Sequence, residues 1–107
     1  MSQHIYKATV RGAEVTVQMG WDKPMRGFYA VVEAPEGSSQ DYLYSNLDDP
    51  RLAANGGLSD SLDYIVEALS RLGIAVPAVL VKEVSSDKLN NVVNRVVKYE
   101  FEKRDKS

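Results

Sequence analysis

The chain has 107 residues, of which 44% are hydrophobic, 26% are charged and none is cysteine. This length and balance predict one folded domain over residues 1–107 and exclude a disordered chain. The lack of cysteine excludes disulfides, thiolate zinc sites and cysteine nucleophiles, and the formal net charge is only -2.

Two strands joined by a tight turn open the chain. Residues 5–10 mix β-branched, aromatic and polar types, and residues 14–19 alternate polar with apolar, as a half-buried strand does. Gly12 can supply the positive φ of a hairpin turn between them. We therefore expect an antiparallel pair with Val15, Val17 and Met19 facing the core.

Two further strands and a long connection follow. Residues 28–33 and 42–44 read as strands, separated from their neighbours by the glycine- and proline-containing stretches 20–27 and 34–40. The stretch 46–57 contains Asp-Asp-Pro and Gly-Gly and is long for a connection, which makes it a candidate functional loop.

The second half of the chain predicts two helices and a strand. Ser59 is the expected N-cap of a helix that Gly73 ends, because its apolar residues recur at helical spacing. Pro77 can open a second helix over 77–89, with Val79, Leu80, Val84 and Leu89 as its buried side, although the β-branched residues leave a strand open as the alternative. Residues 93–101 alternate again as a last strand, and 102–107 form a charged tail that we expect to fray.

The element order is therefore β-β-β-β-α-α-β. The simplest way to bury these apolar stripes is an α+β fold, an antiparallel sheet with two helices on one face. The fourth and last strands are then candidate edges, which leaves a homodimer open.

Candidate catalytic and metal-binding residues are sparse. His4 is the single histidine, lies near the chain end, and is expected on the surface rather than in a catalytic role. Asp48, Asp49 and Asp60 do not follow a calcium-loop spacing, and Asp-Asp-Pro is typical of a turn. We assign no catalytic residue, no metal and no cofactor, and keep a small carboxylate-based enzyme as an alternative.

Charge and side-chain type favour an interaction surface instead. Residues 33–67 hold eight acidic residues and one basic residue, and such asymmetry bears on partners rather than on fold. The loop after residue 20 combines side-chain types that are enriched in interface cores. The candidate partner-binding residues are Trp21, Lys23, Met25, Arg26, Asp48, Asp49 and Asp60.

Nucleic acid is the alternative partner. Strand aromatics such as Tyr42 and Tyr44 could stack bases, yet the sequence pI near 5.3 argues against a phosphate-binding surface. The start of the chain shows no signal-peptide pattern, and the longest apolar run, 73–81, is too short for a membrane span. We expect a cytoplasmic protein that binds another protein and no membrane.

Three stretches, 19–33, 43–50 and 91–99, carry a resemblance. They resemble small uncharacterised proteins found on plasmids, phages and integrated elements of proteobacteria. The resemblance implies an accessory protein of a mobile element, and by analogy such proteins often act by binding a host or plasmid protein. In that setting the protein is expected to modulate or inhibit a host system. It brings no known activity, so it assigns no residue a role.

Overall fold

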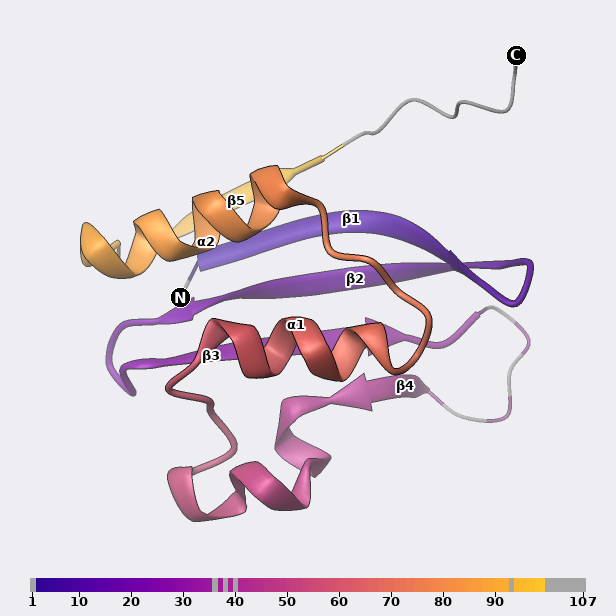
Figure 1. The fold of residues 1–107 in the computed structure, drawn as a ribbon, viewed down its shortest axis with the longest axis horizontal. Helices are drawn as coiled ribbons and strands as arrows, with labels where there is room; N and C mark the ends of the chain where they lie inside the picture. The colour runs from indigo at the N-terminus through magenta and orange to yellow at the C-terminus, as the bar shows by residue number, and fades with distance from the viewer. Residues whose placement is uncertain (1, 36, 38, 40, 93, 100–107) are drawn as a thin grey trace.

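The computed structural model describes residues 2–35, 37, 39, 41–92 and 94–99. They form an α+β fold with a five-stranded mixed sheet in the order β4-β3-β2-β1-β5. The strands are β1 (Ser2–Val10), β2 (Ala13–Asp22), β3 (Gly27–Glu33), β4 (Tyr42–Ser45) and β5 (Arg95–Lys98). Figure 1 shows the two helices, α1 (Leu62–Ser70) and α2 (Ala78–Leu89), in front of this sheet.

The first hairpin is confirmed. β1 and β2 pair antiparallel from His4↔Met19 to Val10↔Ala13, around a turn in which Arg11 and Gly12 both have positive φ, 52° and 81°. Val15, Val17 and Met19 are buried as predicted. The alternation of β2 therefore fixes which face of the sheet meets the core.

The prediction of an entirely antiparallel sheet is wrong at β5. This strand pairs parallel with β1, from Ser2↔Arg95 to Ile5↔Lys98, and the backbone N–H of Tyr99 donates to Ile5 O at 2.8 Å. Both helices lie between β4 and β5 and carry the chain to the far edge of the sheet, and such a crossover permits parallel pairing. Val93 and residues 100–107, which include Phe101 and the predicted tail, lie outside the described residues.

The first helix begins later than predicted. Ser61, not Ser59, is its N-cap and accepts a hydrogen bond from Tyr64 N at 3.4 Å. Ser59 instead pairs with Phe28 of β3 through two backbone hydrogen bonds of 2.8 and 3.0 Å. This bridge extends the edge of the sheet beyond β4, so the helix cannot start there.

Residues 78–89 are helical, which settles the choice between helix and strand. Pro77 is the N-cap of α2, one position before the helix, and Leu80, Val84 and Asp87 form its buried side. Val79 and Leu89, predicted to be buried, are exposed. The buried side thus follows the i, i+4, i+7 spacing, and its third member is an aspartate.

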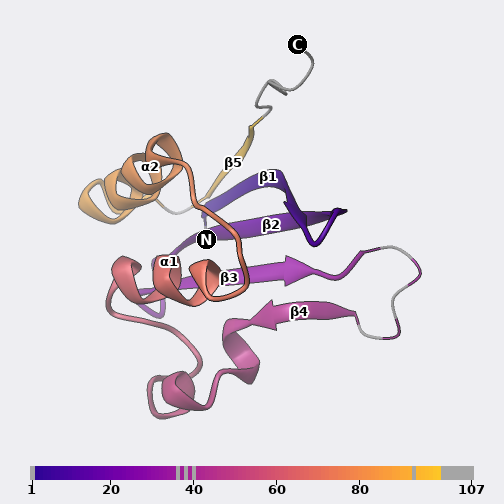
Figure 2. The ribbon, with the colours of Figure 1, turned by 45° about the vertical axis from the view of Figure 1, so that its right-hand side comes forward.

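Both helices cover the same face of the sheet. α1 contacts β3, and α2 contacts β1 and β2, as the layers in Figures 1 and 2 show.

The predicted irregular loop contains two 3-10 turns, η1 (Asn46–Asp48) and η2 (Pro50–Asn55), beside β4. In the described part of the chain, no helix has the length and hydrophobicity to cross a membrane.

Candidate functional site

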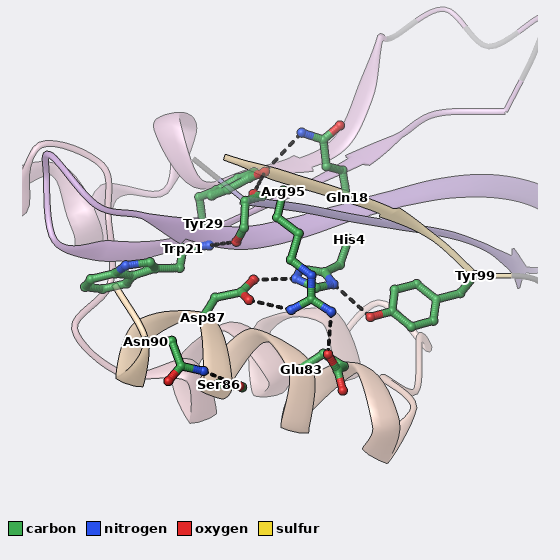
Figure 3. Close-up of polar contacts among 11 residues, drawn as sticks. His4, Gln18, Trp21, Tyr29, Glu83, Ser86, Asp87, Asn90, Arg95 and Tyr99 are labelled. Carbon is green, nitrogen blue, oxygen red and sulfur yellow. Dashed lines mark hydrogen bonds and ion pairs between the residues drawn. The ribbon is translucent and has the colours of Figure 1, made fainter. Parts of the chain in front are cut away.

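A buried polar network links β1, α2 and β5. His4 Nε2 lies 2.6 Å from Asp87 Oδ2, and His4 Nδ1 lies 2.8 Å from the hydroxyl of Tyr99 (Figure 3). Neither His4 nor Asp87 is exposed to solvent. A carboxylate only accepts hydrogen bonds, so Nε2 carries the proton in this pair.

Arg95 ties the same aspartate to the last strand. Its guanidinium donates to Asp87 Oδ1 at 2.7 Å and to Glu83 Oε1 at 2.6 Å, as Figure 3 shows. Glu83 and Asp87 are one helical turn apart on α2, which places both carboxylates toward the strand. Arg95 therefore anchors β5 to α2.

The network continues through Ser2 to the other face of the sheet. The Ser2 hydroxyl hydrogen-bonds Asp87 and accepts from Trp21 N at 2.9 Å. The Ser2 carbonyl accepts from the Tyr29 hydroxyl at 2.7 Å, and Gln18 Nε2 donates to that hydroxyl at 3.1 Å. The chain of bonds thus crosses the sheet from α2 to the helix-free face.

The electrostatics of Asp87 follow from these contacts. Burial acts to raise the pKa of Asp87, but hydrogen bonds from His4, Ser2 and Arg95 outweigh it and hold the pKa below its ordinary value. At neutral pH the carboxylate is ionised, with both of its oxygens engaged. Such an arrangement locks elements together and leaves no free oxygen to act as an acid or base on a substrate.

The prediction that His4 lies on the surface is therefore wrong. His4 is close to the chain end in sequence, but β1 starts at Ser2 and is covered by α2. Both ring nitrogens of His4 are occupied. A catalytic histidine needs one nitrogen that can reach a substrate, so this one serves the fold.

A hollow lies on the opposite, helix-free side of the sheet. Tyr29 and Val31 alternate with the core residues of β3, and Gln18 alternates with those of β2, so these side chains face away from the helices. Residues from the segment that follows β4 form one wall of this hollow. The cavity has a volume of about 390 Å³ and is lined by Gln18, Asp22, Met25, Tyr29, Val31, Asn46, Leu47, Gly56 and Leu58.

Gly56 and Gly57 bring the rim of this hollow together. A Cβ on Gly56 would lie 3.4 Å from Met25 Cε, and one on Gly57 would lie 2.9 Å from Leu47 Cδ2. Both glycines have positive φ, 69° and 86°. The Gly-Gly pair therefore supplies the turn and the space that place Met25 and Leu47 beside one cavity.

The predicted partner-binding residues of the first loop are divided between core and surface. Trp21 is only 2% exposed and packs on Phe28 with ring centroids 5.4 Å apart. Met25 and Arg26 are exposed and Lys23 is half-buried, in the turn between β2 and β3. Of these four residues, Met25 is the one that lines the hollow.

The predicted acidic residues do not form one site. Asp49 accepts hydrogen bonds from the hydroxyls of Tyr44 and Tyr64, both at 2.8 Å, and caps η2. Asp48 is exposed in η1, and Asp60 is exposed before α1. Burial acts to raise the pKa of Asp49, but the hydrogen bonds from the two tyrosines outweigh it and lower that pKa.

Comparison with known proteins gives no relative. No family, no curated protein and no solved structure matches this chain. Within the described residues, no group of three or more histidine, aspartate or glutamate side chains is placed to hold a metal ion. The hollow is therefore the candidate site, and its chemistry alone indicates what it would bind.

Proposed function

We propose that this protein is a non-enzymatic interaction module whose helix-free hollow receives an apolar side chain of a protein partner. The observation that carries the proposal is the pair of large apolar residues at its rim: Met25 is 58% exposed and Leu47 is 75% exposed. Two such side chains beside one concave, mostly apolar cavity are typical of a binding site.

The turn that carries Met25 is held in place. Met25 N donates to Asp22 Oδ1 at 3.3 Å, and Arg26 N donates to Lys23 O at 3.1 Å. On the other wall, the Asn46 side chain is buried and donates to Gly57 O at 2.5 Å. A hollow with fixed walls lowers the ordering cost of binding.

The charge of the site favours a basic partner segment. Asp22 lines the hollow, and none of its described lining residues is basic. Glu33 lies two positions after the lining residue Val31, on the same face of β3, and Asp48 directly follows the lining residue Leu47 in η1. Both acidic side chains are exposed. We therefore expect the bound segment to present an apolar side chain flanked by Lys or Arg.

Nucleic acid receives less support. Tyr29, the aromatic residue of the helix-free face of β3, is buried, and the Tyr44 hydroxyl is bonded to Asp49. Tyr42 is the exposed aromatic residue of β4, and one ring is a poor stacking platform. The carboxylate-enzyme alternative is also less supported, because Arg95 binds both Glu83 and Asp87.

The proposal also places this binding in the cytoplasm, in the setting of a mobile element. The resemblance to mobile-element proteins suggests that the partner is a protein of a host system, met in the cytoplasm. The cysteine-free composition fits a reducing compartment. The absence of a catalytic constellation in the described residues leaves binding as the means by which such a protein would act.

A displayed library of random peptides tests the proposal without knowledge of the partner. We expect selected peptides to share an apolar residue flanked by basic residues, and Leu47→Asp to abolish their binding. Leu89→Asp is the matched control, because Leu89 on α2 is an apolar residue of similar exposure, 83% against 75% for Leu47. A parallel selection from a random single-stranded oligonucleotide library that succeeds where the peptide selection fails, with binding lost on Tyr42→Ala, would favour the nucleic-acid alternative.

A further inference from the structure

A second cavity lies at the end of the molecule where the β1–β2 turn meets the end of α1. It has a volume of about 380 Å³ and is lined by Val10, Arg11, Ala13, Pro35, Leu43, Arg71 and Leu72. Figure 1 shows this turn at the right-hand end of the sheet, where α1 passes into the connection to α2. None of these residues belongs to the hollow of the proposed function.

The lining combines an apolar base with two guanidinium groups. Val10, Leu43 and Leu72 are half-buried against the core, and Arg11 and Arg71 are exposed. Among the described residues, Arg11 makes no ion pair. Arg71 approaches Glu67 at 3.8 Å, with both side chains more than half exposed. Within the described residues, therefore, Arg11 is unpaired by any acidic side chain and Arg71 has only a long, solvent-exposed ion pair.

Arg11 occupies a position that its side chain does not favour. Its φ is 52°, followed by Gly12 at 81°, as in a two-residue hairpin turn of the primed type. Asn, Asp or Gly is preferred at that first position, because a larger side chain is strained there. Strained residues cluster at binding sites, and here the strain places a guanidinium beside an apolar cavity.

We propose that this cavity binds a small apolar group that ends in a carboxylate. Two arginines can hold a carboxylate through charge-assisted hydrogen bonds, while the apolar base takes the attached hydrocarbon. The cavity volume is near the lower end for small-molecule sites, which suits a short chain or one side chain. A free acid and the C-terminal residue of a peptide share this chemistry.

Titration of the full chain followed by amide NMR tests the site. The probes are hexanoate and an N-acetylated dipeptide ending in leucine, with hexanol and the dipeptide amide as uncharged controls. We expect saturable shifts at residues 10–13 and 71–72 with the acids only. The acid that binds more tightly identifies the source, either a free acid or a chain terminus.

Arg11→Gly separates binding from folding. Glycine suits the left-handed turn, so this variant should melt no lower than the parent while binding the acid about tenfold more weakly. Arg71→Gln should weaken binding similarly. Equal binding by Arg11→Gly, equal shifts with hexanol, or no saturable shift at these residues would overturn the proposal.

Discussion

His4 Nε2 and Asp87 Oδ2 lie 2.6 Å apart with neither side chain exposed, although 83 positions separate them in the chain. The pair joins the first strand to the second helix, and Arg95 extends it to the last strand. Three elements from both ends of the chain therefore depend on one carboxylate.

Asp87→Ala should destabilise the fold strongly. It leaves the His4 and Arg95 donors without their buried acceptor, and breaking a buried pair costs about 3–5 kcal/mol of unfolding free energy. Urea unfolding measures the loss. Glu83→Ala is the matched control, because it removes the other, partly exposed carboxylate of Arg95, and we expect about 1 kcal/mol. Equal losses for the two variants would contradict a central role for Asp87.

Acid should weaken the protein through the same group. The pKa of Asp87 is held below its ordinary value of 3.8, so its contribution to stability is complete above pH 3.8. That contribution is lost as the pH falls through the lower pKa of the folded state. Carbon NMR of the Asp87 carboxyl should show a titration midpoint below 3.8. A midpoint at or above that value would refute the assigned hydrogen bonds.

Alkali should weaken the protein through Tyr6. Burial raises the pKa of Tyr6 from 10.0 to about 12, so the folded state resists ionisation of this phenol. The corresponding stability is present below pH 10 and is lost as the pH rises toward 12. Denaturant midpoints across this range should fall less steeply in Tyr6→Phe than in the parent. Identical slopes would show that other tyrosines dominate the alkaline loss.

Gly20→Ala should be far more damaging than another glycine substitution in the same hairpin. An added Cβ would collide with the backbone carbonyl of Ser2, with the carbonyl carbon 2.8 Å away, at a cost of about 3 kcal/mol. Gly12→Ala meets no atom within 4 Å and should cost about 1 kcal/mol for its left-handed backbone. Thermal melting compares them, and a Gly20→Ala protein as stable as Gly12→Ala would count against the close approach of Ser2.

Local patterns predicted the elements that depend on local physics. Alternation in β2 and the glycine turn identified the hairpin, and Pro77 with Leu80 and Val84 indicated the second helix. These features act over a few residues, so the sequence displays them directly.

Long-range pairing could not be predicted in the same way. No residue close to His4 in sequence indicates that His4 is buried or that it pairs with Asp87, because this contact depends on how α2 lies over β1. The alternation of β5 is the same whether its neighbour is parallel or antiparallel. The hollow depends on Gly56 and Gly57 approaching Met25 and Leu47, which only the folded chain brings together.

Binding of a protein partner at the hollow is tested by the affinity of a library-selected peptide for the parent protein, Leu47→Asp and Leu89→Asp. We expect Leu47→Asp to lose binding at least about tenfold, because a carboxylate replaces an apolar contact. Leu89→Asp should bind as the parent does, and both variants should melt at the parent's temperature. Undiminished binding by Leu47→Asp would show that the hollow is not the interaction site.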